Sequence, residues 1–202
     1  MDNIRPYIQK HNQELLSLVN EKLTHDVWEK YCLGTLSKWE MDSVSFYSHP
    51  HELAGINLNK YNCENFFNMP EEPEIDKVIY IKGKQVPLFK IKRIAGTVVA
   101  KDKTKKTVTL LTVDGIVTAK IYGGIFSNYD KQISERGSDG KKHIIRKSEF
   151  TRGNKIIVTG IRQGDLFIAK KYSKTPYHLI ETIENIDEEG NLETYNRANG
   201  GE

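Results

Sequence analysis

The chain has few of the features that mark an enzyme, a membrane protein or a zinc protein. It contains only two cysteines, Cys32 and Cys63, with no Cys-x-x-Cys pair and no nearby histidine to complete a zinc knuckle. No apolar run approaches the roughly 18 residues that a membrane helix needs. The first residues also lack a basic-then-apolar secretory leader. We therefore expect a cytoplasmic protein with reduced, buried thiols, no membrane association and no cofactor.

The motifs that build autonomous catalytic centres are also missing. No GxxxxGK[ST] phosphate-binding loop occurs, and the stretch Gly137-Ser-Asp-Gly140-Lys-Lys reads as a solvated loop. No GxSxG nucleophile elbow occurs either. Polymerases need paired carboxylates to hold two magnesium ions, but no Asp-x-Asp pair lies among the few acids of residues 77–174. We assign no catalytic residue, and expect the chain to be non-catalytic by itself.

Charge is distributed very unevenly along the chain. Between Lys77 and Lys174 there are 23 Lys/Arg and 7 Asp/Glu, whereas residues 1–76 carry 6 basic and 13 acidic residues. Residues 175–202 carry 1 basic and 7 acidic residues. The net charge of +3 therefore hides a central excess of +16. A basic block made of short alternating segments is typical of a polyanion-binding surface.

The periodicity of this basic block predicts five strands and a connecting helix. The expected strands are Ile91–Val99, Thr107–Val113, Ile116–Tyr122, Lys155–Ile161 and Leu166–Tyr172. Residues 125–135 have helical spacing, and His143–Lys147 is a further strand candidate. Three strands, a helical connector and two strands is the order of an OB-fold barrel, which commonly presents a strand face to single-stranded nucleic acid.

The fold class expected is α+β, with an α-helical N-terminal segment followed by a five-stranded Greek-key OB-fold β-barrel. Thr24 and Asp26 predict a cap between two helices of the N-terminal segment. The predicted regions are a helical linker region (1–63), an acidic proline-containing linker (64–76), a basic OB-fold nucleic-acid-binding domain (77–174) and an acidic C-terminal extension (175–202). The last residues, Asn196–Glu202, are expected to be disordered.

The candidate nucleic-acid ligands are cations at predicted loops and strand ends, together with one aromatic residue. They are Lys101, Lys103, Lys105, Lys106, Lys120, Tyr122, Arg146, Lys147, Arg152, Arg162 and Lys170. Aromatic residues interleave with them: Phe89, Tyr122, Phe126, Phe150, Phe167 and Tyr172. Some of these rings must be core, and an exposed one would contribute about 1–3 kcal/mol by stacking on a base. A rival explanation stays open, in which the acidic flanking segments pack on the barrel and neutralise it internally.

Two short motifs suggest narrower hypotheses. The stretch Gln85-Val86-Pro87-Leu88-Phe89 fits the Q-x-x-L-F pattern of sliding-clamp ligands, with Gln85, Leu88 and Phe89 as the binding residues. We favour the alternative that Leu88 and Phe89 begin the first barrel strand. The stretch His49-Pro50-His51-Glu52 offers three potential metal ligands, but Gly55 stands where a zinc-protease helix needs its second histidine. A capped helix start is preferred there, and no metal site is assigned.

Four stretches together resemble the C-terminal portion of the bacterial and phage replicative DNA polymerase III alpha subunit. They are Trp39–Leu53, Ile94–Val99, Leu110–Gly115 and Arg152–Gly160. The resemblance runs from about Trp39 to Tyr172 and implies an OB fold that contacts single-stranded template, preceded by the end of a linker region. The family's polymerase palm, its amino-terminal phosphoesterase-like domain and a tau-binding domain have no counterpart here. The family's clamp-binding motif also lies upstream of the Phe46-Tyr47 segment, unlike Gln85–Phe89.

Three functional hypotheses follow. The first is a non-catalytic module that binds single-stranded template DNA for a polymerase III alpha-type replicative polymerase, a DNA-directed nucleotidyltransferase. The second is a docking module for replisome partners such as the clamp or its loader. The third is a chain that completes an active polymerase together with a separately encoded polymerase core. The resemblance leaves open whether the chain is a fragment, a split-gene product or a truncated reading frame.

Overall fold

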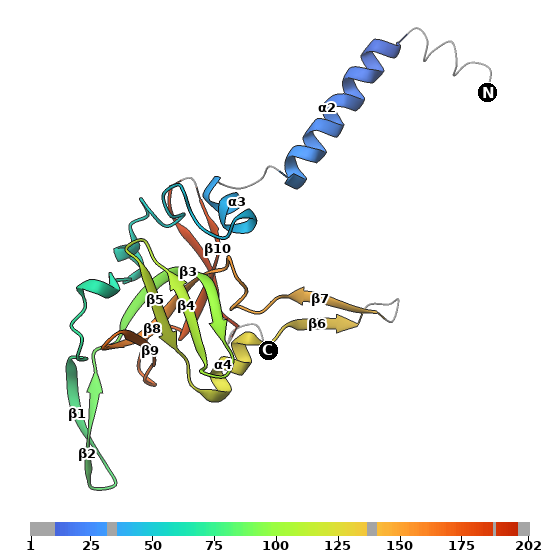
Figure 1. Cartoon of the computed structure of the whole chain (residues 1–202). Coiled ribbons are helices and arrows are strands. Elements are labelled where there is room, and N and C mark those ends of the chain that lie inside the picture. Colours follow the sequence, from blue (N-terminus) through green and yellow to red (C-terminus); the bar gives the residue numbers. More distant parts are fainter. Residues whose placement is uncertain (1–10, 32–35, 137–140, 188, 198–202) are drawn as a thin grey trace.

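Five of the alternating segments form strands that close into a β-barrel (Figure 1). The structure, a computed structural model, describes residues 11–31, 36–136, 141–187 and 189–197. The barrel strands are β3 (Lys92–Asp102), β4 (Thr107–Leu111), β5 (Ile116–Lys120), β8 (Lys155–Gln163) and β9 (Leu166–Ala169). The helix α4 (Gly123–Asp130) follows β5. The α+β class and the closed five-strand barrel are thus confirmed.

The strand order is that of an OB-like barrel. β3, β4 and β5 form an antiparallel meander, in which Thr107 pairs with Lys120. β5 pairs in parallel with β9, and β8 pairs antiparallel with both β3 and β9, which closes the ring. Two strands pair with the same edge of β8: β10 (Ile180–Ile186) pairs with the first half of β8, and β9 pairs with the second half. The change of partner falls at Thr159–Gly160.

Alternating apolar residues of these strands fill the barrel. In β4, Val108 and Leu110 are fully buried, and in β5 Val117 and Ala119 face the same core. Phe126 of α4 closes one end of the barrel against Phe150, with ring centroids 5.1 Å apart. Strict alternation of this kind is what a half-buried strand requires, because successive side chains point to opposite faces.

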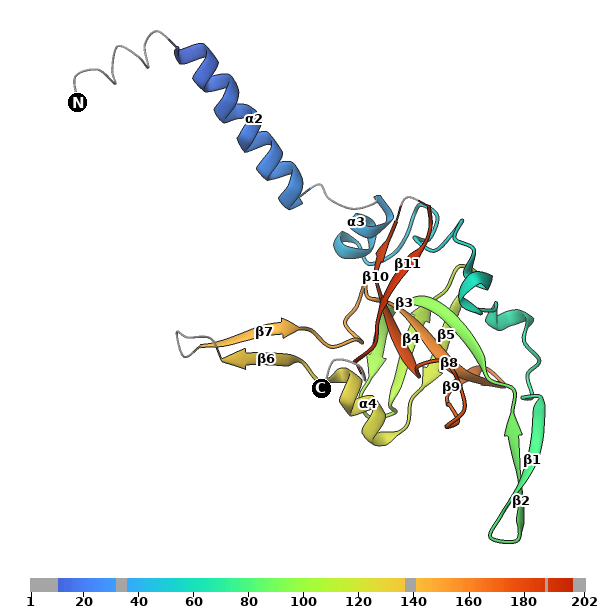
Figure 2. The same cartoon turned by 180° about the vertical axis from the view of Figure 1, so that it is seen from behind.

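Several elements were not predicted from the sequence. They are the hairpin β1 (Ile75–Ile81) and β2 (Lys84–Phe89), the strand β6 (Ile133–Arg136), which pairs with β7 (Lys142–Arg146), and the pair β10 and β11 (Leu192–Tyr195). The predicted connector helix over 125–135 is wrong in its second half, because α4 ends at Asp130 and β6 begins at Ile133. The β1–β2 and β6–β7 hairpins project from the barrel in different directions (Figures 1 and 2).

The N-terminal part contains α2 (Asn12–Tyr31), α3 (Leu36–Ser43) and the short 3-10 turns η1 (Leu58–Tyr61) and η2 (Phe66–Asn68). α2 runs without a break through Thr24 and Asp26, so the predicted cap there is wrong; both residues cost little inside a helix. Every α2 side chain whose burial is described is exposed, and the helix stands away from the barrel (Figure 2). None of the described helices is long and apolar enough to cross a membrane.

The predicted region boundaries stay predictions, but the contacts across them are informative. Phe66 and Met69, from the 64–76 segment, belong to the barrel core, as do Leu179 and Ile180 from the C-terminal extension. In the stretch expected to be disordered, Asn196 is buried, whereas residues 198–202 lie outside the described residues. Cys32 also lies outside them, while Cys63 is a buried free thiol.

Candidate nucleic-acid interface

The lysine-rich turn between β3 and β4 is fixed by the side chain of Asp102. Its carboxylate accepts the backbone N–H groups of Thr104 and Lys105, at 2.8 and 2.9 Å. The hydrogen bond from Lys105 N–H is the main reason why the pKa of Asp102 is lowered. Lys106 then takes a left-handed conformation with φ 56° and its carbonyl accepts Ile121 N–H at 2.9 Å. The one acid of the turn therefore shapes the backbone, and the side chains of Lys103 and Lys105 are exposed.

Asp130, at the end of α4, holds two of these lysines. Lys101 Nζ donates to Asp130 Oδ1, Lys103 Nζ lies 3.3 Å from Oδ2, and Ser148 Oγ donates to Oδ1 at 2.8 Å. Burial opposes ionisation of Asp130, but the hydrogen bonds from Lys101 and Ser148 outweigh it and lower its pKa. Lys101 is largely covered, whereas the Lys103 side chain is 71% exposed. A single carboxylate shared by two lysines leaves a net positive charge at this end of the barrel.

The structure brings six of the predicted ligands together around this turn, and we call them the turn cluster. Its members are Lys101, Lys103, Lys105, Lys106, Lys120 and Tyr122. Lys120, opposite Thr107 in the β4–β5 ladder, donates from Nζ to the Lys105 carbonyl. Lys106 Nζ lies 5.3 Å from the centroid of the Phe126 ring, and Tyr122, which precedes α4, is 59% exposed. The cluster thus offers exposed cations beside one exposed ring.

Arg146 lies elsewhere and its donors are already engaged. Its Nε donates to Glu149 at 2.9 Å, a terminal nitrogen donates to Glu184 at 2.6 Å, and its guanidinium lies 3.4 Å from the Tyr195 ring centroid. Burial opposes its charge, but these two carboxylates raise the pKa of Arg146. Arg146, the last residue of β7, therefore fastens that strand to β10 and β11. Its neighbour Lys147 is exposed.

Three more predicted ligands are also separate from the turn cluster. Arg152 is exposed and donates to the Ser45 carbonyl at 3.1 Å. Arg162 is nearly covered: it donates to the Met69 carbonyl at 2.6 Å and its guanidinium lies 4.6 Å from the Phe66 ring centroid. It therefore fixes η2 over the barrel. Lys170 Nζ lies over the rings of Phe89 and Tyr172, at 5.2 and 5.3 Å.

The residues of the Q-x-x-L-F motif occupy strand β2. Leu88 pairs with Lys77 and Phe89 with Ile75 in the β1–β2 ladder, and both side chains are half-buried. The exposed Gln85 donates from Nε2 to Tyr80 Oη at 2.9 Å. Leu88 and Phe89 do not begin the first barrel strand, which starts at Lys92, so the favoured alternative is wrong in register. The clamp-binding role of this segment stays a prediction.

The two histidines of the His49-Pro50-His51-Glu52 stretch have separate partners. His49 Nδ1 lies 2.6 Å from the carboxylate of Glu40, and Ser48 also hydrogen-bonds to that carboxylate. The hydrogen bonds from Ser48 and His49 lower the pKa of Glu40 to about 2. His51 is buried: its Nδ1 accepts Leu53 N–H at 3.0 Å and its Nε2 lies 2.9 Å from the Leu111 carbonyl. Accepting at Nδ1 requires a neutral ring with its proton on Nε2. His51 therefore pins residues 51–53 onto β4.

Because His51 is buried as a neutral ring, we expect the protein to lose stability at mildly acidic pH. Burial lowers its pKa below 6.5, so the unfolded chain binds a proton more readily than the folded one. The free energy of unfolding contributed by neutral His51 is fully present above about pH 6.5 and falls as the pH drops below that value. We expect urea unfolding between pH 7.5 and 5.5 to show a smaller pH slope for His51→Gln than for the natural chain. Equal slopes would contradict this role.

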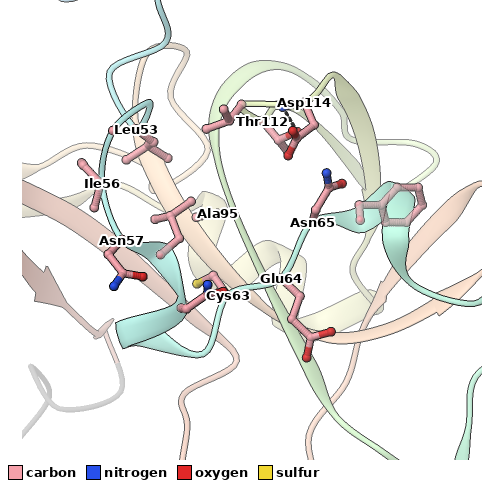
Figure 3. A pocket seen from close by; sticks show the side chains of 14 residues that line it. Leu53, Ile56, Asn57, Cys63, Glu64, Asn65, Ala95, Thr112 and Asp114 are labelled. Atoms are coloured by element: carbon pink, nitrogen blue, oxygen red, sulfur yellow. Dashed lines mark hydrogen bonds between the residues drawn. The ribbon is translucent and has the colours of Figure 1, made fainter.

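A cavity of about 250 Å³ lies between residues 53–66 and the barrel. Figure 3 shows its lining side chains, among them Leu53, Ile56, Asn57, Cys63, Glu64, Asn65, Ala95, Thr112 and Asp114. Glu64 accepts Lys92 Nζ at 2.7 Å and Asn65 Oδ1 accepts a backbone N–H at 2.8 Å. Burial raises the pKa of the Cys63 thiol to about 11, so the thiol is not a nucleophile at neutral pH. With no Lys or Arg in its lining, this cavity is unsuited to phosphate.

The acidic flanks neutralise part of the basic block, as the rival explanation required. On the N-terminal side Glu52 accepts Lys155 Nζ at 2.6 Å, and Glu64 pairs with Lys92. On the C-terminal side Glu181 pairs with the buried Arg93 at 2.6 Å. These pairs lie on parts of the barrel away from the exposed lysines of the turn cluster. The internal pairing and an exposed basic surface therefore coexist.

Comparisons with known proteins connect the chain to DNA polymerases. No protein-family model matches it, and no solved structure matches it. Over 193 residues, 95% of this chain, it is 43% identical to "Probable DNA polymerase YorL" of Bacillus subtilis strain 168. The same identity and coverage hold for "DNA-directed DNA polymerase" of Bacillus phage SPbeta. The chain spans only 15% of the length of each relative. It is therefore homologous to a segment of proteins named DNA polymerases.

Proposed function

We propose that this chain is an OB-type module of a DNA polymerase that binds single-stranded template DNA through the turn cluster. The proposal includes the Greek-key connectivity and a polymerase of the III alpha type, which the motifs between Trp39 and Tyr172 support. The observation that carries it is the pair of exposed lysines, Lys103 and Lys105, at one turn of a closed barrel, in a chain homologous to part of DNA polymerases. The module contributes binding and leaves the chemistry to carboxylates elsewhere in the polymerase.

The turn cluster suits the backbone and the bases of a single strand. Lys103 and Lys105 are exposed and would neutralise phosphates, while Lys101 remains paired with Asp130 and holds the turn to α4. Tyr122 exposes a ring on which one base could stack, worth about 1–3 kcal/mol. Arg146 and Arg162 are poor ligands by contrast, because breaking their internal contacts would cost more than a phosphate contact returns.

Fluorescence anisotropy with labelled oligo-dT at several salt concentrations tests the proposal. We expect salt-sensitive binding whose log–log slope is about 0.7 per phosphate neutralised. Reversing two exposed cations in the double variant Lys103→Glu/Lys105→Glu should weaken binding at least about tenfold and reduce the slope by about 1.4, for two lost contacts. Lys82→Glu/Lys84→Glu, which makes the same charge change at the β1–β2 turn, is the matched control.

Equal affinities of these two variants would exclude the turn cluster as the interface. If the natural chain does not bind oligo-dT at micromolar concentration, the proposed role in single-strand binding is excluded. That result would favour the docking hypothesis, for which the exposed apolar residues of α2, such as Leu16, Val19 and Leu23, are the supporting observation. Capture of a purified polymerase core by the chain would then be the positive result.

A further inference from the structure

A large hollow of the described chain lies outside the turn cluster. It has a volume of about 650 Å³ and is formed where the β1–β2 hairpin faces the segment 172–177, which follows β9. We call it the hairpin groove. Its chemistry is set by three aromatic residues, Phe89, Tyr172 and Tyr177, and by lysines on both walls. Sequence reasoning singled out two of the rings but not the groove, because hairpin β1–β2 was not predicted.

The aromatic side chains of the hairpin groove are held in place by hydrogen bonds and cations. Phe89 N–H donates to Tyr172 Oη at 2.9 Å, which ties the hairpin to the opposite wall. Tyr172 N–H donates to Thr175 Oγ1 at 3.0 Å, so the wall segment is folded on itself. The Arg93 guanidinium lies 4.5 Å from the Tyr177 ring centroid. All three rings are half-buried, so each keeps part of its surface accessible. Ordered rings of this kind suit base stacking, since little rotamer entropy is lost on binding.

The charge of the hairpin groove is positive. Four lysines line it (Lys77, Lys90, Lys92 and Lys174), against two carboxylates, Glu64 and Asp76. Glu64 is occupied by Lys92, and Lys90 pairs with Glu74 at 3.2 Å. Within the described part of the chain, Lys77 and Lys174 have no ion-pair partner, and both are exposed. They come from the two walls of the groove, Lys77 from β1 and Lys174 from the segment 172–177.

We infer that the hairpin groove is a second contact site for single-stranded DNA, distinct from the turn cluster. A base would stack on the exposed part of a Tyr172 or Tyr177 ring, and Lys77 and Lys174 would neutralise the flanking phosphates. Aromatic rings between cations are the combination by which proteins hold single strands without reading their sequence. The carboxylate of Asp76 on the rim opposes binding, which limits the site to a supporting contact. This inference rests on the proposed function and adds a second point of attachment to it.

The decisive experiment compares three double variants with the same charge change on labelled oligo-dT. Lys77→Glu/Lys174→Glu should weaken binding about fivefold or more, whereas the control Lys82→Glu/Lys84→Glu, on the same hairpin but outside the groove, should stay within about twofold. Lys103→Glu/Lys105→Glu reports on the turn cluster in parallel. All six lysines are exposed, and within the described part of the chain only Lys103 among them has an ion-pair partner, Asp130. Circular dichroism checks that each variant folds.

Equal binding by the groove variant and its control overturns the inference while leaving the turn cluster intact. Failure of every protein, including the natural chain, to bind oligo-dT removes the proposed function itself. Photocrosslinking with iododeoxyuridine gives an independent readout: we expect crosslinked peptides from residues 172–177. Crosslinks confined to other peptides overturn the inference. Thymidine monophosphate binding is measured for the same variants. If Lys77→Glu/Lys174→Glu loses thymidine monophosphate binding but binds oligo-dT as the natural chain does, the inference is overturned, because the groove would then hold a free nucleotide.

Discussion

Glu149→Gln should lower the free energy of unfolding by about 3–5 kcal/mol. The Glu149 side chain is 3% exposed and accepts hydrogen bonds from Arg146 Nε at 2.9 Å and from Thr182 Oγ1, while Arg197 Nε lies 3.4 Å away. The neutral amide of glutamine would leave the largely covered guanidinium groups of Arg146 and Arg197 without the carboxylate that they share. Urea unfolding at pH 7.5 measures the difference.

The matched control is Glu184→Gln, which removes the other carboxylate of Arg146. Glu184 is 41% exposed, so its pair is screened by water and its loss should cost less than about 0.5 kcal/mol. A Glu149 variant as stable as the Glu184 variant would contradict the assignment of Glu149 as the central anion. Glu149 also has structural contacts through its backbone, whose N–H donates to the Tyr129 carbonyl at 3.0 Å. The glutamine variant keeps these backbone contacts, which isolates the effect of the charge.

The strands of the barrel could be predicted because their signal is local. Alternation in Thr107–Leu111 and Ile116–Lys120 places every second residue in the core, and this pattern needs no knowledge of distant segments. The β1–β2 and β10–β11 pairs lack that signal, because their burial is partial and irregular. The helix α4 was predicted too long for a related reason: Ile133 has helical spacing but pairs with Arg146 in a hairpin.

The candidate site was predicted only in part, because a count of charges does not identify their partners. Arg162 binds backbone carbonyls more than 90 residues away, and Arg146 binds Glu184, 38 residues away. Nothing in the sequence around Arg162 marks it as structural, and of the two carboxylates that bind Arg146 only Glu149 is near it in the sequence. The turn cluster could be predicted because Lys101 to Lys106 are adjacent in sequence. Lys77, Lys174 and Tyr177 sit at the borders of the basic block, where only the three-dimensional structure unites them.

Ion pairs with the acidic flanks also explain how a segment with such a charge excess can fold. Glu52, Glu64 and Glu181 each bind a cation of the barrel strands, so much of the repulsion is offset within the chain. Exposed cations that these three carboxylates do not bind include Lys103 and Lys105 on the β3–β4 turn and Lys77 on the β1–β2 hairpin. The unpaired charge is therefore concentrated where a polyanion could approach, which is a more specific arrangement than a uniformly basic barrel.

Gly160→Ala should destabilise the barrel by about 3 kcal/mol or more, because closure brings another backbone against this position. A Cβ at Gly160 would lie 2.1 Å from the Ile168 carbonyl oxygen and 2.9 Å from its carbon. Gly160 pairs with Lys92 of β3 on one edge and Ala169 of β9 on the other, so it cannot move away from one strand without disturbing the other. Thermal and urea unfolding measure the loss.

Gly124→Ala provides the contrasting substitution. Gly124 lies in the first turn of α4, and a Cβ there has no other atom within 4 Å. Alanine should leave stability unchanged or raise it by up to about 1 kcal/mol, because it restricts the unfolded chain. If the two alanine variants proved equally stable, β8 and β9 would have to lie farther apart than the closed barrel requires. Closure at Gly160 also sets the positions of β9 and of the segment after it. Gly160→Ala should therefore disturb DNA binding at the hairpin groove more than DNA binding at the turn cluster.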